Sequence, residues 1–416
     1  MDPANNRKGI YDILLEKGKI GKIARNISIA STKTIDAKGK IVMPGLIDMH
    51  VHLREPGRED KETIAAGTSA ALKGGITSLL TMPNTTPAID CPENIKLLKR
   101  LIQTDAKANV FIAGTITLGR KGEKLSEIAK LKQQGALAIT DDGASVDNNA
   151  LFLKALELAR ENNLLVICHS EDKALSKNGV VNLGITSTRM GVRGISCDSE
   201  YKRVQRDIRL AERSKAAVHI AHLSCKESVE IVAQAKKRGV KVTAETAPHY
   251  FALTEEAVLG FDTNTKMNPP LRSQGDLEAI KQGLKNGVID VIASDHAPHT
   301  ENEKDIEFER AAFGVIGLET ELALGITELV GKGILDWSGL VKVMSANPAR
   351  ILGLDKGSLG LERDADVIIV SPDEQWQLKK EEIVSKSKNS PFIGKRLKGR
   401  VEYTICGGKV VYTKRK

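Results

Sequence analysis

The chain has 416 residues, of which 41% are hydrophobic and only 3% aromatic, so its core must be built mainly from Ile, Leu, Val and Ala. This length suits a large α/β barrel with an accessory domain, and no apolar run approaches the length of a membrane span. The net charge of +9 would permit nucleic-acid binding, but Lys and Arg are interleaved with Asp and Glu along the expected helices, which favours a solvated surface and a small anionic substrate.

The two ends of the chain are expected to form strands and turns. Residues 10–15 are a strand candidate, and turn signals follow as far as Pro44-Gly45. Strand candidates near the C-terminus are 365–370, 401–406 and 409–412. Because both ends share a character that the middle lacks, we expect residues 1–45 and 356–416 to form one small discontinuous β domain.

Between residues 46 and 355, strand-like apolar runs alternate with amphipathic stretches. The strand candidates are 46–52, 77–82, 109–117, 136–141, 164–169, 217–223, 240–246 and 289–295. The helical stretches include 92–104, 123–133, 147–161 and 225–237, with further helices at 338–345 and from Asn347. This alternation predicts parallel strands with helical crossovers, and eight units predict a closed, TIM-like (β/α)8 barrel.

The first of these strands predicts a metal site. Asp48, His50 and His52 are spaced by two, so on a strand they point the same way. Two neighbouring imidazoles can reach one ion at about 2.0–2.1 Å. A single His on a strand would more often have no functional role. Here two His lie between Asp48 and Arg54 in a chain with only 8 His, which favours a role as metal ligands.

Polar side chains able to bind metal also end other predicted strands. They are Asn84 after the second strand, Asp141 and Asp142 after the fourth, His169 after the fifth, His222 after the sixth and Asp295 after the eighth. In a barrel of this kind the carboxyl ends of the strands form the face that carries active sites. Any one of these residues could be a buried His or a helix cap, but coincidence at six strands is a poor explanation.

Imidazoles and carboxylates without a thiolate suit zinc or a similar divalent ion. The set exceeds what one catalytic zinc needs, so two zinc ions bridged by hydroxide are expected. Such a site acidifies water and polarises a carbonyl. Asp295 is placed to take the proton from that water.

These residues resemble the amidohydrolase superfamily and, within it, the type I dihydroorotase family. The resemblance runs from about Asp36 to the C-terminus. Its motifs are His50-Val51-His52-Leu53-Arg54-Glu55-Pro56-Gly57, Thr81-Met82-Pro83-Asn84-Thr85, Asp141-Asp142-Gly143, Asn268-Pro269-Pro270-Leu271-Arg272, Ser294-Asp295-His296-Ala297-Pro298-His299 and Phe313-Gly314. The chain opens with Asp2-Pro3-Ala4-Asn5-Asn6, so the first strand of the family's β domain is expected to be shortened.

The resemblance implies a role for each residue. His50 and His52 would bind one zinc and His169 and His222 the other, with Asp142 bridging and Asp295 acting as ligand and catalytic base. The substrate-binding residues would be His52, Arg54, Asn84 and His299, with Asn268 and the Phe313-Gly314 backbone lining the ring. The implied reaction is reversible hydrolysis of (S)-dihydroorotate to N-carbamoyl-L-aspartate in pyrimidine biosynthesis.

Several alternatives stay open at this point. Asp141 could bridge instead of Asp142, since the end of a strand can be misjudged by one residue. A carboxylated lysine is not expected, because the nearest lysines, Lys130 and Lys132, lie on the preceding helix. A hydantoinase, dihydropyrimidinase or allantoinase is disfavoured because those substrates lack the carboxylate that Arg54 and Asn84 would bind. A non-catalytic scaffold is disfavoured because the ligand set is complete.

Residues 296–314 are rich in charge and contain His299, which predicts a mobile lid, the alternative being an ordinary exposed loop. The 5 Cys are widely spaced without a Cys-x-x-Cys pair, and no signal peptide opens the chain. Reduced thiols and a cytoplasmic protein are therefore expected. The expected partner is a small-molecule substrate, with neither nucleic acid nor membrane. A homodimer and an association with aspartate carbamoyltransferase are left open.

Overall fold

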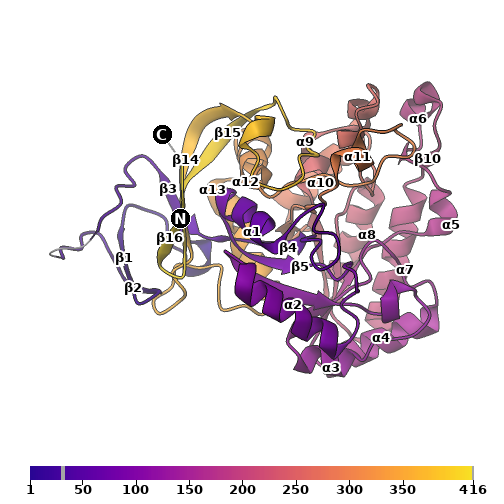
Figure 1. Ribbon diagram of the computed structural model, residues 1–416, viewed down its shortest axis with the longest axis horizontal. Helices are drawn as coiled ribbons and strands as arrows, with labels where there is room; N and C mark the ends of the chain where they lie inside the picture. The colour runs from indigo at the N-terminus through magenta and orange to yellow at the C-terminus, as the bar shows by residue number, and fades with distance from the viewer. Residues whose placement is uncertain (30–32, 415–416) are drawn as a thin grey trace.

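The computed structural model describes residues 1–29 and 33–414 (Figure 1). Residues 30–32 and 415–416, which fall in the terminal segments expected to form the small domain, lie outside the described residues.

Eight parallel strands form the centre of the molecule, in the order β13-β12-β11-β8-β7-β6-β5-β4. Each overlaps one of the eight predicted strands, which confirms the barrel prediction. Their bounds are β4 Leu46–Val51, β5 Ile76–Thr81, β6 Asn109–Gly114, β7 Ala136–Ile139, β8 Leu165–Cys168, β11 Val218–Ile220, β12 Val242–Thr246 and β13 Val291–Ile292. Every residue of β4 and β5 is buried, as strands covered on both faces require.

The sheet closes almost completely where its two edge strands approach. The amide of His52 donates to the carbonyl of His296 at 2.9 Å, and Val51 and His296 form an isolated parallel bridge. The amide of Ser294 donates to Oδ1 of Asp48 at 3.2 Å. These contacts bring the residues after β4 next to the residues after β13, and so bring together the first and eighth groups of predicted site residues.

Helices surround the barrel strands (Figure 1). The longer ones are α1 Ile64–Lys73, α2 Pro92–Asp105, α3 Ile128–Gln133, α4 Asn149–Glu161, α7 Asp198–Ser214, α8 Lys226–Lys237 and α10 Gln274–Lys285. Side-chain caps fix several of their starts, since Asn148 accepts the amides of Ala150 and Leu151, and Ser273 accepts that of Asp276. Shorter helices lie in the loops: α5 Lys173–Ser176, α6 Ile185–Met190, α9 Pro248–Ala252 and α11 Glu301–Lys304.

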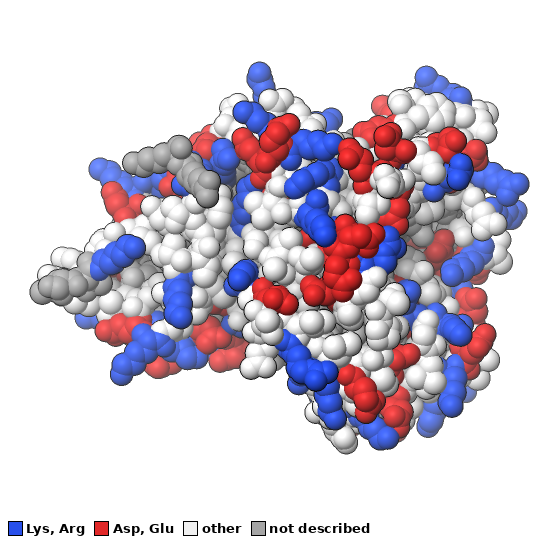
Figure 2. All heavy atoms as spheres, viewed as in Figure 1, with Lys and Arg blue, Asp and Glu red and all other residues white. Residues whose placement is uncertain are grey.

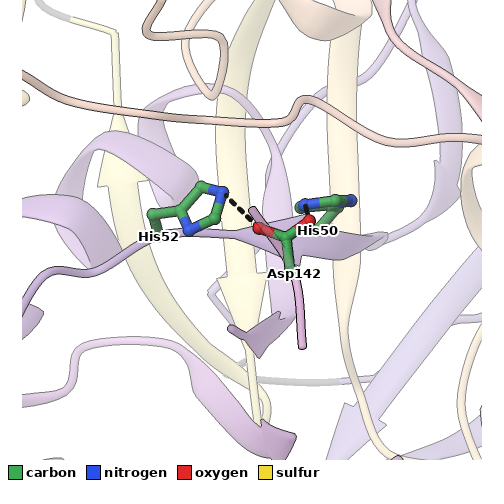
Figure 3. Close-up of side chains that lie close together, drawn as sticks. All are labelled: His50, His52 and Asp142. Atoms are coloured by element: carbon green, nitrogen blue, oxygen red, sulfur yellow. Dashed lines mark ion pairs between the residues drawn. The ribbon is translucent and has the colours of Figure 1, made fainter. Parts of the chain in front are cut away.

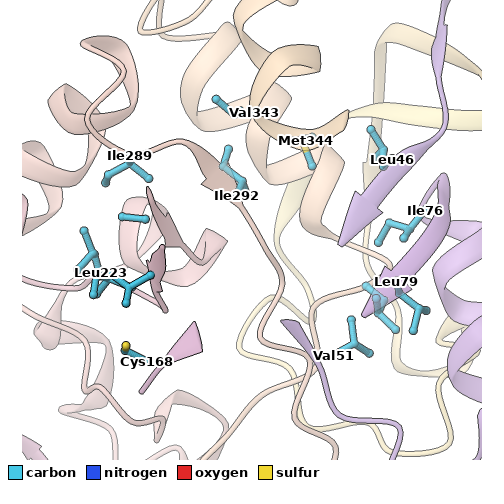
Figure 4. Packing of buried hydrophobic residues seen from close by; sticks show 14 of the residues in the cluster. Leu46, Val51, Ile76, Leu79, Cys168, Leu223, Ile289, Ile292, Val343 and Met344 are labelled. Carbon is cyan, nitrogen blue, oxygen red and sulfur yellow. The ribbon is translucent and has the colours of Figure 1, made fainter. Parts of the chain in front are cut away.

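The core between strands and helices is aliphatic, as the composition predicts. Leu46 of β4 belongs to the same cluster as Ile76 and Leu79 of β5, and the cluster continues through Ile292 and Met344 (Figure 4). A second cluster joins Ile47, Met49 and Leu80 to Ala349 and Leu352. This packing fixes the strands from which the site residues project.

The helices after residue 320 differ in one respect from the prediction. The helix expected at 338–345 and the one expected from Asn347 are joined without a break. They comprise α13 Trp337–Val341, a π-helical turn Lys342–Ala346 and α14 Asn347–Leu352. A similar π-helical turn, Ile326–Val330, extends α12 Glu321–Gly325. Because Pro348 has no N–H to donate, the wider π turn before it lets the helical path continue.

Both ends of the chain supply a separate antiparallel sheet of order β16-β15-β14-β3. Its strands are β3 Ile41–Pro44, β14 Val367–Gln377, β15 Arg396–Cys406 and β16 Lys409–Thr413, and a hairpin of β1 Asp12–Glu16 and β2 Lys19–Ala24 lies beside it. The predicted discontinuous β unit is therefore present. Met1 is tied to this sheet, since its amino group donates to the carbonyl of Val42 at 2.7 Å.

Lys and Arg are mixed with Asp and Glu over the face seen in Figure 2, in keeping with the expected solvated surface. Across residues 1–29 and 33–414, no helix combines the length and apolar character needed to cross a bilayer.

Candidate metal centre and active site

His50 near the end of β4, His52 just after that strand and Asp142 after β7 form the first potential metal-binding group. Nε2 of His50 lies 3.2 Å from Oδ1 of Asp142, and Nε2 of His52 lies 3.4 Å from Oδ2 of the same carboxylate (Figure 3). All three side chains are buried. Each oxygen of Asp142 thus faces a different imidazole of the His-x-His pair.

A second group shares the same aspartate. Nδ1 of His169, after β8, lies 3.6 Å from Oδ1 of Asp142, and Nε2 of His222, after β11, lies 3.9 Å from it. The two imidazole nitrogens are 2.8 Å apart. Ligand atoms in each group lie within 4.8 Å of one another, so each group has the dimensions of an ion site.

Asp295, after β13, faces the first group. Its Oδ1 lies 3.6 Å from Nε2 of His50 and 3.3 Å from Nε2 of His52. Burial alone would raise its pKa, but the charge of His50 and the close contact with His52 outweigh burial and lower the pKa to about 2. The structure therefore brings together all six residues predicted as metal ligands, with Asp295 ionised.

The neighbouring Asp141 points elsewhere. Its Oδ1 accepts the amides of Ile116 and Thr117 at 2.8 and 3.0 Å, and its Oδ2 accepts the Thr117 hydroxyl. These contacts use the Asp141 carboxylate to hold the loop after β6. The geometry favours Asp142 as the residue between the two histidine pairs.

Carboxylate and amide groups behind the histidines fix their tautomers. Nδ1 of His50 donates to Oε1 of Glu245 at 2.6 Å, and Nδ1 of His52 donates to Oδ1 of Asn84 at 2.8 Å. Nε2 is therefore the nitrogen of each ring that faces Asp142 and is available to a metal ion. Sequence reasoning missed Glu245, although a carboxylate near the end of the seventh predicted strand is a signal of the same kind as those at the other strand ends.

The donor set fits a divalent metal ion. Nε2 of His50 is buried and, within the described ranges, has no hydrogen-bond partner, although it faces two carboxylates. Burial lowers the pKa of His222 to about 4, assisted by the charge of His169, which keeps its imidazole available as a neutral ligand. Buried nitrogen and carboxylate oxygen donors without thiolate suit zinc or a similar ion.

Three site residues have left-handed backbone conformations, at φ 63° for Arg54, 36° for His222 and 47° for Asp295. Non-glycine residues adopt positive φ rarely, and such strain collects at functional sites. Asp48 of β4, by contrast, accepts the amides of His50 and Ser294 and so helps to close the barrel.

On the side of the site beside Asp295, Arg54 and His299 approach each other. Nε of Arg54 donates to the carbonyl of Pro298 at 3.1 Å. Lys61 donates to Nδ1 of His299 at 3.1 Å, so His299 carries its proton on Nε2, which donates to the carbonyl of Phe313 at 2.7 Å. Because Nε2 of His299 carries a proton, it cannot accept a hydrogen bond from Arg54. The 3.5 Å distance from Arg54 Nη2 to this nitrogen is therefore a contact and not a hydrogen bond. Burial, with the charge of Arg54, lowers the pKa of His299 to about 3 and keeps it neutral.

The Phe313-Gly314 backbone is held by groups distant in sequence. Nζ of Lys304 donates to the carbonyls of Ala312 and Gly314 at 2.8 and 3.1 Å, and Asn389 donates to the Gly314 carbonyl at 3.1 Å. A Cβ at Gly314 would lie 3.1 Å from Nε2 of His299, so glycine permits this close approach. The motion expected for residues 296–314 stays a prediction, but the segment is packed against the barrel in this structure.

Asn268 lies on another side of the site. Its Nδ2 donates to Oε2 of Glu171 at 3.3 Å, and the same oxygen lies 3.5 Å from Nε2 of His169. Glu171 was also missed by sequence reasoning, although it follows His169 by two residues. The contact connects the predicted ring-binding residue to the second metal-binding group.

The chain is similar to known proteins over nearly its full length. The profile of a family described as Dihydro-orotase-like matches residues 39–228. The chain is similar to a dihydroorotase from Elusimicrobium minutum, with 52% identity over 99% of this chain and 95% of that protein. It is also similar to a dihydroorotase from Geobacter metallireducens, with 48% identity over 99% of this chain and 97% of that protein.

Solved structures share the fold. An L-hydantoinase (dihydropyrimidinase) from Arthrobacter aurescens superposes with a TM-score of 0.89 at 26% identity, covering 98% of this chain and 93% of that one. A dihydropyrimidinase from Brevibacillus agri has a TM-score of 0.85 at 23% identity, covering 97% of this chain and 91% of that one, a likeness in fold alone.

Proposed function

Because the chain belongs to the dihydroorotase family, we propose that it catalyses the reversible hydrolysis of (S)-dihydroorotate to N-carbamoyl-L-aspartate in pyrimidine biosynthesis. The observation that carries the proposal is the convergence of four histidines on Asp142, with Asp295 beside them and Arg54 at the edge of the same site. The protein is a hydrolase acting on cyclic amides. We assign dihydroorotate as its substrate because Arg54 places a positive charge at the edge of the site.

We assign the metal ligands from the two groups that share Asp142. His50 and His52 would hold one zinc ion, His169 and His222 the other, and Asp142 would bridge them, with Asp295 as a further ligand. Bound zinc would acidify a water molecule and polarise the ring carbonyl. Glu245 and Asn84 hold the His-x-His imidazoles in the tautomer that this binding requires.

Asp295 moves the proton in this proposal. Its low pKa keeps it ionised at neutral pH, so it can accept a proton from the attacking water. It then gives this proton to the ring nitrogen as the amide C–N bond breaks. The buried position of Asp295 keeps bulk water from competing for the proton.

Arg54 supplies the charge that would select an anionic ring. Burial lowers the pKa of Arg54 only to about 10, so the guanidinium stays protonated at neutral pH. A planar guanidinium can bind the dihydroorotate carboxylate through two parallel hydrogen bonds. His52, Asn84 and His299 would complete the contacts to the substrate. The Nε2–H of His299 would donate its hydrogen bond to the substrate carboxylate in place of the Phe313 carbonyl. Asn268 and the Phe313-Gly314 backbone would line the ring.

A parallel assay tests the assignment. We expect metal-loaded protein to hydrolyse dihydroorotate and to form it from N-carbamoyl-L-aspartate, with far lower activity on hydantoin, dihydrouracil and allantoin. Hydantoin is the informative rival, because the Arthrobacter aurescens L-hydantoinase has the same fold at 26% identity. Preference for any neutral ring over dihydroorotate would overturn the proposal.

We also propose residues 1–45 and 356–416 as one folding unit and 46–355 as the catalytic unit. The five free thiols favour a cytoplasmic location. A homodimer, and an association with aspartate carbamoyltransferase, are proposals that sedimentation of the protein with and without that enzyme would test.

A further inference from the structure

Two cysteines outside the metal centre lie together at the start of neighbouring helices. Cys197 is the residue before α7 and Cys225 the residue before α8. Their sulfur atoms lie within 4.8 Å of each other. Cys197 is partly exposed, whereas Cys225 is fully buried. An oxidant can therefore reach the Cys197 thiol from solvent, whereas the Cys225 thiol is shielded from solvent.

A buried guanidinium lies beside this pair. Arg272 is 3% exposed, and its Nη2, which lies 3.7 Å from Oε2 of Glu200, has no hydrogen-bond partner in the part of the chain that the structure describes. Its Nη1 donates at 2.7 Å to Oδ1 of Asn182, the oxygen that lies 4.0 Å from Sγ of Cys197. A buried guanidinium close to a thiol favours its thiolate form, and the charge of Arg272 acts on Cys197 in this direction.

The two thiols differ in acidity. A hydrogen bond with Cys225, followed by the charge of Arg272, lowers the pKa of Cys197 despite its partial burial. The hydrogen bond with Cys197, together with burial and the charge of Glu200, raises the pKa of Cys225. Oε1 of Glu200 lies 3.4 Å from Sγ of Cys225, and this carboxylate disfavours a thiolate there. The pair thus combines a partly exposed nucleophile with a protonated partner behind it, the arrangement of a sensor and resolving cysteine.

The same cluster could be read as a cation site, because Glu227 lies within the same distance of both sulfurs. Two features oppose that reading. Glu227 is exposed, and Arg272 would repel a cation. Positive charge favours a thiolate and disfavours a bound metal ion, so the electrostatics favour redox chemistry.

We propose that Cys197 and Cys225 form a redox-active dithiol that a hydroperoxide converts to a disulfide. The Cys197 thiolate attacks one oxygen of the hydroperoxide, the O–O bond breaks, and hydroxide leaves from hydrogen peroxide. The sulfenic acid formed on Cys197 is then attacked by Cys225, whose proton passes to the departing hydroxyl, and water leaves. One peroxide is reduced and two thiols are oxidised by two electrons in total.

The dithiol is linked to the active site through two short segments. Cys225 follows the metal-site residue His222 by three positions, and the intervening Ser224 accepts a hydrogen bond from Nε of Arg272 at 3.1 Å. Arg272 in turn follows Asn268 by four positions. Closing a disulfide replaces the thiolate that faces Arg272 and pulls on the 222–225 segment. Oxidation is therefore expected to lower the activity, and a thiol reductant to restore it; this activity effect rests on the proposed function, whereas disulfide formation does not.

The test is oxidation of the full-length, metal-loaded protein with equimolar hydrogen peroxide, followed by alkylation, digestion without reductant and mass spectrometry. We expect a peptide pair joined through Cys197 and Cys225 and a loss of two of the five free thiols. Before oxidation, iodoacetamide should alkylate Cys197 about tenfold faster than Cys91, which is also partly exposed but has a raised pKa. Cys197→Ser should abolish the linked pair, and the matched Cys91→Ser variant should retain it.

Absence of the linked peptide from oxidised wild-type protein would overturn the proposal, as would alkylation of Cys91 at the rate of Cys197. These readouts need no enzymatic activity, so they separate failure of the dithiol from failure of the assigned reaction. If the disulfide forms but activity on dihydroorotate is unchanged, the coupling to His222 and Asn268 is wrong while the modification site stands.

Discussion

Oε1 of Glu245 lies 2.6 Å from Nδ1 of His50, and this contact decides which nitrogen of His50 faces the carboxylates of the site. A carboxylate can only accept a hydrogen bond, so Nδ1 must carry the proton. The other oxygen of Glu245 lies 3.1 Å from Nε2 of His219, which positions the carboxylate itself. Coulombic attraction from His50 outweighs burial and lowers the pKa of Glu245, so it is ionised throughout the neutral range.

Glu245→Gln should therefore weaken metal binding without removing a ligand. Loss of a carboxylate behind a metal-binding His typically costs about 10- to 100-fold in metal affinity or activity. Zinc titration of the metal-free variant by calorimetry measures the change. Glu321→Gln is the matched control, because burial raises the pKa of Glu321 and an amide would replace an acid that is already neutral. Equal zinc affinity in wild type and Glu245→Gln would remove Glu245 from the proposed metal centre.

Asp142→Ala should remove one metal ion selectively, because Asp142 is the residue shared by both ligand groups. We expect the metal content after dialysis to fall towards one ion per chain, with little activity left. Asp141→Ala should keep its metal, since that carboxylate binds the loop at Ile116 and Thr117. Wild-type activity should need no bicarbonate. A carboxylated lysine found in the site by mass spectrometry would contradict the role of Asp142.

Arg54→Ala should raise KM for dihydroorotate. A hydrogen bond to a charged group contributes about 1.5–3 kcal/mol, which corresponds to roughly 10- to 100-fold in affinity. Activity on dihydrouracil, if measurable, should change little, because that ring has no carboxylate. Arg58→Ala is the control on the same loop, since Arg58 pairs with Asp60 and Glu303 at the surface. Equal losses on both rings would count against carboxylate binding by Arg54.

Asp295→Asn should lower kcat more than it changes KM. The amide cannot accept the proton from the attacking water, and a positioned general base contributes about 10²–10⁴-fold. The variant should still fold, with weakened metal binding, so zinc content and thermal unfolding must be measured beside the kinetics. A fully metal-loaded Asp295→Asn enzyme with kcat near wild type would exclude Asp295 as the base.

The metal-binding half of the site could be predicted from sequence because it follows local rules. The His-x-His spacing matches the period of a strand, and His169, His222 and Asp295 each stand at or near the end of an apolar run that predicts a strand. Parallel strands in a barrel bring such ends together, so no further information was needed to place these residues near one another.

The supporting half could not be predicted in this way. Lys61 reaches His299 across 238 residues, and Asn389, near the C-terminus, binds the amide of His299 and the carbonyl of Gly314. Periodicity carries no signal for such contacts, because they depend on how loops return over the barrel. The commitment of the His299 proton to the Phe313 carbonyl likewise requires the three-dimensional structure.

Lys304 gives the last prediction, which concerns pH. Lys304 is 5% exposed, and among the described residues its ammonium donates to the backbone carbonyls of Lys266, Ala312 and Gly314. Burial, followed by the charge of Lys266, lowers the pKa of Lys304 to about 7. An unfolded lysine has a pKa of about 10.4, so between these values the unfolded chain binds more protons at this position than the folded protein. The contribution of Lys304 to the free energy of unfolding must therefore rise with pH from about 7 to about 10.4 and be least favourable below that window.

Lys304→Met should remove this pH dependence. Urea unfolding of metal-loaded wild type and variant at several pH values gives the difference in free energy of unfolding, and that difference should shift in favour of wild type as pH rises, by up to about 1.4 kcal/mol per pH unit. Lys332→Met is the control, because Lys332 is exposed and pairs with Glu328 at the surface, where such pairs contribute little. A wild-type-minus-variant difference that stays flat from pH 7 to 10, or that falls, would mean that Lys304 is not held in the folded protein with a depressed pKa.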